Sequence, residues 1–259
     1  MNYKEKFEKF GFVIIRDAFS EKECALYKET ALNYFLDDFG KLTRNLNPNY
    51  RDGNESTKPL AFNYDYFEPL YSIFTNEKLR KAFDQITNNK TMFLHHSDVH
   101  VDTVAGKGWH RDSINNSDGR AGKKWKDMYI TKDIESQVDG EKYCIVRAAF
   151  YLQEHTSNQD GLFVIAGSHL NDKFNKEMYV KTKTGDVILF DARLLHRGGH
   201  RVLKGNHRSA VFWGMGRDNI FSHEHKQAAI ARQTYQLGIE NYIFNDKLKK
   251  ILDENNIGY

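Results

Sequence analysis

Two short stretches decide how the chain is organised: WHRD at residues 109–112 and FDARLLHRGG at residues 190–199. The first offers the imidazole of His110 and the carboxylate of Asp112, two residues apart. The second offers the imidazole of His196 after an apolar run. Two histidines and one carboxylate form the facial set that holds non-haem Fe(II) and leaves coordination positions open. We therefore predict that His110, Asp112 and His196 converge on one metal ion.

The residues just before the first stretch alternate as a β-strand does. From Thr91 onward, His96, Asp98, His100 and Asp102 would share one strand face with Met92 and Leu94, and apolar residues would dominate the opposite face. A strand face that carries His-Asp-His-Asp is unusual in a packed core. This pattern indicates a polar interior, such as the lumen of a barrel.

Further strands and helices are expected on both sides of this segment. Short strand patterns punctuated by Gly, Asn and Asp are typical of a sandwich or jelly roll. We expect strands at residues 12–15, 143–152, 161–165, 180–183, 187–190, 201–203 and 208–213. Helices are expected at residues 2–10, 20–39, 64–74, 77–86, 221–236 and 244–254, with a loop at 41–60. The helix at residue 20 should open on a capping box formed by Ser20 and Glu23.

These elements predict one mainly β domain over residues 1–259 with flanking helices. Its parts would be a helical N-terminal region at about 1–90, a β core at about 91–217 and C-terminal helices at about 221–256. The polar insert at residues 113–142 is long for a loop, which favours a lid or a binding insertion.

The composition excludes several classes of protein. A net charge of +3 is too small to favour nucleic acid or a membrane surface as the main partner. No apolar run approaches the 18 or more residues of a spanning helix, and no signal-peptide pattern opens the chain. Cys24 and Cys144 lack any motif, so we expect unpaired thiols in a reducing, cytoplasmic environment.

The proposed metal ligands have competitors within the sequence. The pattern His-x-Asp occurs at residues 96–98, 100–102 and 110–112. We interpret the first two copies as ordinary polar pairs. The third lies where a strand gives way to a polar loop, so its side chains can meet at a barrel mouth beside Trp109. For the second histidine, His200 and His207 are alternatives, but His196 directly follows the strand pattern and Gly198-Gly199 lets the backbone turn near a ligand.

Four segments together resemble the phytanoyl-CoA dioxygenase-like family of Fe(II)/2-oxoglutarate oxygenases, which includes ectoine hydroxylases and small-molecule halogenases. The resemblance covers most of the chain. The segments are the N-terminal entry at residues 7–24, the Trp-His-x-Asp motif at 109–112, the run ending Ala166-Gly167-Ser168-His169, and the distal-histidine strand at 185–199. The family commonly has proline at the position of Ala166.

The resemblance implies a double-stranded β-helix (jelly roll, cupin-like) that uses Fe(II), 2-oxoglutarate and O2. It implies an arginine about one strand beyond the distal histidine that binds the far carboxylate of 2-oxoglutarate. Arg208 lies twelve residues beyond His196 and fits this role, with Arg197 and Arg201 as alternatives. It also implies a polar residue on the preceding strand that lines the cosubstrate pocket, and His96 is the candidate.

The sequence therefore predicts a dioxygenase that hydroxylates a C–H bond of a small metabolite and releases succinate and CO2. Asp112 favours hydroxylation, because related halogenases carry a small residue there. Within the insert at 113–142, the basic residues Arg120, Lys123, Lys124 and Lys126 permit an anionic substrate, although these charges can equally serve to solvate a loop. Two alternatives are a β-helix protein that binds metal or ligand without turnover, and a cupin-type metalloenzyme that needs no 2-oxoglutarate.

Overall fold

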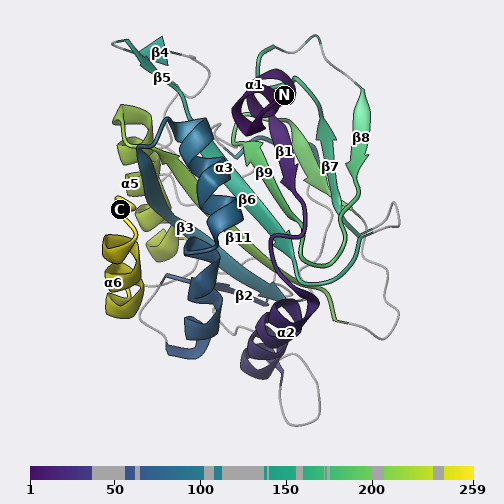
Figure 1. Cartoon of the computed structure of the whole chain (residues 1–259), viewed down its shortest axis with the longest axis vertical. Coiled ribbons are helices and arrows are strands. Elements are labelled where there is room, and N and C mark those ends of the chain that lie inside the picture. The colour runs from purple at the N-terminus through teal and green to yellow at the C-terminus, as the bar shows by residue number, and fades with distance from the viewer. Residues whose placement is uncertain are drawn as a thin grey trace.

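Two β-sheets packed against each other form the centre of the computed structural model (Figure 1). It describes residues 1–36, 56–61, 65–101, 108–112, 137–138, 140–155, 160–171, 173, 176–199, 207–235 and 242–259. The larger sheet has the strand order β1-β9-β6-β11-β3-β2 and the smaller sheet the order β10-β7-β8. All the pairings are antiparallel. The mainly β architecture with flanking helices is confirmed, and the sheets remain open rather than closing into a barrel.

The strands are short except at the centre of the larger sheet. Their bounds are β1 Phe12–Ile15, β2 Ser56–Pro59, β3 Thr91–Val101, β4 Gln137–Val138, β5 Glu141–Lys142, β6 Ile145–Tyr151, β7 Leu162–Ile165, β8 Glu177–Val180, β9 Val187–Asp191, β10 His196–Gly198 and β11 Ser209–Arg217. Strands β4 and β5 form a separate hairpin.

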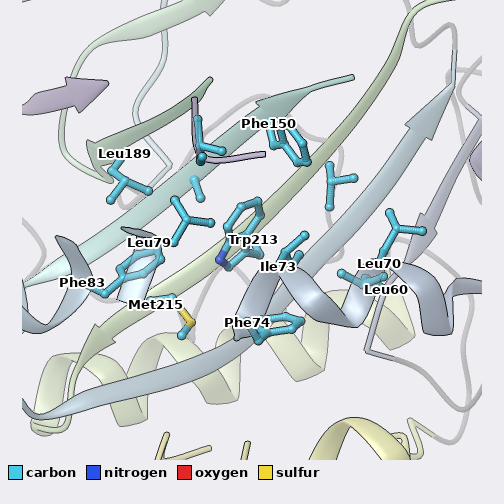
Figure 2. Packing of buried hydrophobic residues seen from close by; sticks show 14 of the residues in the cluster. Leu60, Leu70, Ile73, Phe74, Leu79, Phe83, Phe150, Leu189, Trp213 and Met215 are labelled. Atoms are coloured by element: carbon cyan, nitrogen blue, oxygen red, sulfur yellow. The ribbon is translucent and has the colours of Figure 1, made fainter. Parts of the chain in front are cut away.

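The larger sheet has one face toward the helices and one toward the smaller sheet. The helix-side face carries every second residue of β6, β9 and β11, and its centre is Trp213, which is fully buried (Figure 2). Phe74 and Phe150 lie on this side, in the same cluster as Trp213. The opposite, inner face packs Ala149 and Tyr151 against the smaller sheet. Alternation along the strands thus separates an apolar core from an inner space.

Helices cover the outer face and one edge of the larger sheet. They are α1 Tyr3–Phe10, α2 Glu21–Phe35, the 3-10 helix η1 Asp65–Phe74, α3 Glu77–Thr87, α5 Ile220–Tyr235 and α6 Asp246–Glu254. Helix α3 contacts β1, β3 and β11, and α5 packs on β3 (Figure 1). The predicted capping box at Ser20 is present, with Glu23 as its partner. None of the helices in the described ranges is both long and apolar enough for a bilayer-spanning segment.

Five strands differ from the sequence prediction. Two of them are β4 and β5, which form a hairpin inside the segment expected to be a polar insert. Residues 56–59 form β2 instead of a loop, because their backbone pairs with the edge of β3. Strand β8 ends at Val180, where we expected a strand to begin, and Thr182 makes only an isolated bridge with His155. Residues 196–198 form β10, which the sequence did not predict. The expected strand at 201–203 and nearly all of the insert at 113–142 lie outside the described residues.

Strand β3 contains an irregularity that matters for the site. Ser97 faces Trp213 and Phe93 faces Met215, so residues 94–96 lie opposite the single residue Gly214. His95, within this bulge, has a positive φ of 56°. Bulges redirect side chains and release backbone groups from the ladder, and they are common next to functional sites.

Candidate metal centre

A pair of backbone hydrogen bonds brings the two histidines of the predicted triad together. The amide of His110 donates to the carbonyl of His196 at 3.0 Å, and the amide of His196 donates to the carbonyl of His110 at 3.0 Å. The amide of Asp112 donates to the carbonyl of Ala192 at 2.9 Å. The loop that carries WHRD is therefore attached to the end of β9 and the start of β10, and three side chains far apart in sequence converge.

The donor atoms of the three side chains face a common point. Asp112 Oδ1 lies 3.7 Å from His110 Nε2 and 3.6 Å from His196 Nε2. Both separations are too long for a hydrogen bond, yet one ion with bonds of about 2.1 Å reaches donors up to about 4.2 Å apart. The Nδ1 atoms lie 2.9 Å from the carbonyls of Gly108 and Leu194, so each ring donates outward and turns its Nε2 lone pair inward. This donor set fits an octahedral metal such as Fe(II), and among the described residues it is the one cluster of this kind.

The environment keeps Asp112 and His196 unprotonated. Burial lowers the pKa of His196 to about 4, although Asp112 opposes this shift. Burial raises the pKa of the Asp112 carboxyl, but His196, Arg147 and His110 lower it by more, so the net pKa lies well below its usual range. Near neutral pH the site therefore presents a neutral imidazole at His196 and a carboxylate at Asp112, which are the forms that bind a metal.

Arg147 is a residue of this site that the sequence did not point out. Its Nε donates to Asp112 Oδ2 at 3.0 Å, and its Nη1 donates to the carbonyl of His96 at 3.2 Å. A signal was present, because Arg147 stands in the middle of β6, where all seven residues are buried. A charged residue within such a strand is rarely tolerated without a partner.

His96 lies on the inner face of β3, as the alternation predicted. Its Nδ1 lies 3.3 Å from Nε2 of His225 on α5, and its Nε2 lies 3.9 Å from Asp98 Oδ2. Burial lowers the pKa of His225 to about 3. His225 was not predicted either, because a lone histidine on a helix carries no signal of its own.

Arg208 directly precedes β11 and lies at the other end of the inner face. Its guanidinium lies over the ring of Tyr151, 5.3 Å from the centroid. It also acts electrostatically on His155 and Tyr179: burial and then Arg208 lower the pKa of His155 to about 4, and burial raises that of Tyr179 to about 12. The register places Tyr151 beside Ala210 and Arg147 beside Gly214, so Arg208 and the triad mark opposite ends of one surface.

The competing residues have other surroundings or fall outside the described residues. Arg197 donates to Glu177 at 2.6 Å and its guanidinium lies 3.9 Å from the centroid of Phe163 and 5.2 Å from that of Trp109. His100 Nδ1 lies 3.2 Å from the hydroxyl of Thr57. Asp102, His200 and Arg201 are outside the described residues.

The fold and the site together define a class: a jelly-roll protein with two histidines and one carboxylate at one end of the inner space. The model of the phytanoyl-CoA dioxygenase (PhyH) family matches residues 7–210, so the chain belongs to this family. The predicted resemblance is confirmed. Fe(II), 2-oxoglutarate and O2 are the cofactor and cosubstrates of the family, and the chain is an oxygenase of this type. A comparison with the curated proteins gives no match.

Solved structures share the fold at low sequence identity. The α-ketoglutarate-dependent epimerase SnoN from nogalamycin biosynthesis has a TM-score of 0.57 at 12% identity, over 82% of this chain and 80% of that one. HygX from Streptomyces hygroscopicus, with nickel, 2-oxoglutarate and hygromycin B bound, has a TM-score of 0.54 at 19% identity, over 83% and 87%. EctD from S. alaskensis, with 2-oxoglutarate and 5-hydroxyectoine, has a TM-score of 0.55 at 18% identity, over 83% and 74%.

Proposed function

We propose that the protein hydroxylates an unactivated C–H bond of a small metabolite, with release of succinate and CO2. The observation that carries this proposal is the carboxylate of Asp112, whose Oδ1 completes the set formed by the two histidine Nε2 atoms. When bound, iron together with 2-oxoglutarate and O2 supplies the oxidising chemistry. The residues supply the ligands, an open face and a shaped pocket.

His110, Asp112 and His196 are the proposed Fe(II) ligands, and Arg208 is the proposed partner of the far carboxylate of 2-oxoglutarate. Arg208 suits this role because a planar guanidinium binds a carboxylate through two parallel hydrogen bonds. Between Arg208 and the triad, the inner face presents the small side chains of Ala149 and Ala210.

His96 is proposed to line the cosubstrate pocket at its metal end. Its ring faces the inner space, and its carbonyl accepts from Arg147, which in turn holds Asp112. His225 packs against the same ring from α5, with the ring centroids 5.6 Å apart. The two rings also face each other through their nitrogen atoms, because His96 Nδ1 lies 3.3 Å from His225 Nε2.

The ligand set supports the proposed type of oxidation, and the similar solved structures support the proposed class of substrate. Asp112 occupies the position that a halide needs in related halogenases, which supports hydroxylation over halogenation. SnoN is an epimerase, so epimerisation, desaturation and ring closure are the competing outcomes. Structures of similar proteins hold nogalamycin RO, hygromycin B and 5-hydroxyectoine, which supports a small molecule as substrate here. An anionic substrate would suit the four basic residues of the stretch 120–126 within the insert.

An anaerobic titration tests the metal and cosubstrate sites together. Purified protein receives Fe(II) and then 2-oxoglutarate, and a weak visible charge-transfer band should appear that saturates with one equivalent of each. His196→Ala should abolish the band, and His207→Ala, which changes a rival histidine, should leave it intact. A protein that binds iron but develops no band would favour the cupin-type enzyme that works without 2-oxoglutarate.

A metabolite screen then tests turnover and the reaction type. Compounds that stimulate succinate release are identified, and the mass of each product is measured under 18O2. Hydroxylation adds one labelled oxygen, desaturation or ring closure removes two hydrogens, and epimerisation leaves the mass unchanged. An intact charge-transfer band without any stimulated succinate release across a broad pool would favour the binding protein without turnover.

A further inference from the structure

We propose that Arg147 is a positioning residue that restricts Asp112 to coordination through one oxygen and thereby keeps a position open for O2. This inference rests on the proposed function, because it concerns how the same site holds its metal. Arg147 acts through Asp112 and is not itself proposed to touch the metal or the substrate.

The two oxygens of Asp112 have different surroundings. Oδ1 faces both histidine Nε2 atoms, whereas Oδ2 accepts from Arg147 Nε at 3.0 Å. A charge-assisted hydrogen bond of this kind fixes the plane of the carboxylate and occupies the second oxygen. Asp112 is 21% exposed and Arg147 is 6% exposed at the side chain, so water competes little for the contact.

Coordination of Asp112 through one oxygen matters because the metal has a limited number of coordination positions. An octahedral metal held by three protein atoms would have three positions left, two for 2-oxoglutarate and one for O2. If Asp112 bound through both oxygens, only two positions would remain, and 2-oxoglutarate would fill them. The hydrogen bond from Arg147 thus separates a site that can take O2 from one that cannot.

The surrounding strands are shaped to receive the guanidinium. A Cβ on Gly214 would lie 3.1 Å from Arg147 Nη1, so the absence of a side chain there makes room for the group. The bulge of β3 at residues 94–96 lies opposite Gly214, and the carbonyl of His96 accepts from the same Nη1 at 3.2 Å. A buried cation is costly unless it is hydrogen-bonded, and Asp112 and His96 accept hydrogen bonds from Nε and Nη1 here.

Substitution of Arg147 tests the inference by metal binding, without turnover. Arg147→Gln should weaken the binding of Ni(II) and Fe(II) by 10- to 100-fold, the usual loss when a partner of a metal ligand is removed. The Co(II)-loaded variant should show changed visible absorption, because the coordination number changes. Arg147→Lys keeps the positive charge but lacks the planar guanidinium. Its metal affinity should lie between that of the parent and that of Arg147→Gln. Arg197→Gln, which removes an arginine that contacts Glu177, should behave as the parent.

Gly214→Ala is a second variant for the case in which Arg147→Gln fails to fold. Its methyl group would displace Nη1 but retain the arginine, so metal affinity should fall by less than in Arg147→Gln while thermal stability of the metal-free protein is checked separately. Unchanged metal affinity and unchanged Co(II) absorption in whichever of the two variants folds would overturn the inference. A parent protein that binds no metal would overturn the proposed function instead.

Chemical rescue provides a measurement that would not depend on Arg147 if its role were purely structural. Asp112→Ala removes the ligand and leaves Arg147 facing the vacated place. Added formate should then restore Ni(II) binding, since it can take both the metal position and the hydrogen bond. Formate should fail to do so in Asp112→Ala/Arg147→Gln. Equal rescue with and without Arg147 would contradict the proposed role.

Discussion

At the scale of single residues, the inner face is polar at its two ends and apolar between them. Asp112, held by Arg147, occupies one end, and Arg208 beside Tyr151 occupies the other. Each arginine is placed to bind a carboxylate, one from the protein and the other, we propose, from 2-oxoglutarate. The two guanidinium groups therefore have separable functions, and substitutions should separate them.

Arg208→Ala should weaken 2-oxoglutarate binding and leave metal affinity unchanged. The loss of hydrogen bonds to a charged group amounts to about 3 kcal/mol, which is about 100-fold in Kd. Arg208→Lys should fall between the parent and Arg208→Ala, because lysine keeps the charge but not the paired geometry. Anaerobic titration of the charge-transfer band measures these constants.

Arg197→Ala is the matched control for Arg208→Ala, because Arg197 is an alternative anchor that the structure pairs with Glu177. Its Kd for 2-oxoglutarate should equal that of the parent. A large increase in Kd for Arg197→Ala, together with no change for Arg208→Ala, would transfer the proposed role from one arginine to the other.

At the scale of elements, the strands that support the site depend on close approach of backbone to backbone. Gly185 lies just before β9, the strand that leads to the distal histidine, and has a φ of +91°. A Cβ at this position would lie 2.1 Å from the carbonyl oxygen of Phe19. The amide of Phe19 in turn donates to the carbonyl of Gly185 at 3.1 Å, which ties the start of β9 to the segment before α2.

Gly185→Ala should lower the free energy of unfolding by about 3 kcal/mol, because backbone strain adds to a clash that no side chain can relieve. Gly140→Ala isolates the strain. Gly140 also has a positive φ, of +81°, but apart from its chain neighbours none of the described residues has an atom within 4 Å of the added Cβ. The free energy of unfolding of Gly140→Ala should fall by only about 1 kcal/mol. Urea denaturation measures both values, and equal losses would show that the contact with Phe19 is unimportant.

At the scale of the whole molecule, buried histidines link stability to pH. Burial is the largest cause that lowers the pKa of four of them, to about 3 for His95 and His225 and about 4 for His155 and His196. In the unfolded chain a histidine has a pKa of about 6.5. Between these values the unfolded state binds protons that the folded state does not, so stability is full above pH 6.5 and declines as pH falls.

The free energy of unfolding of the metal-free protein should therefore fall between pH 7 and pH 5. Each such histidine lowers the free energy of unfolding by up to about 1.4 kcal/mol for each pH unit below pH 6.5. Urea denaturation at several pH values and constant ionic strength measures the slope. His95→Asn, which keeps a residue that tolerates positive φ, should reduce the slope. A stability that stays constant down to pH 5 would contradict this account.

Local patterns in the sequence predicted much of the fold, whereas features that depend on pairing were missed. The alternation in β3 and the capping box at Ser20 are readable because their causes lie within a few residues. Strand β2 is polar and ends at Pro59, and only its partner β3 makes it a strand. The triad was predicted from residue types and its convergence is seen, but Arg147 and His225 join the site through contacts that no local pattern contains.

The reciprocal backbone hydrogen bonds between His110 and His196 have a practical consequence for handling the enzyme. They hold the two rings together by the fold itself, so the ligands for the ion are in place before any ion arrives. Iron that oxidises in air should then be removable with a chelator and replaceable with fresh ferrous iron without a refolding step. Repeated cycles of metal removal and reconstitution with ferrous iron should give the same charge-transfer spectrum in the presence of 2-oxoglutarate.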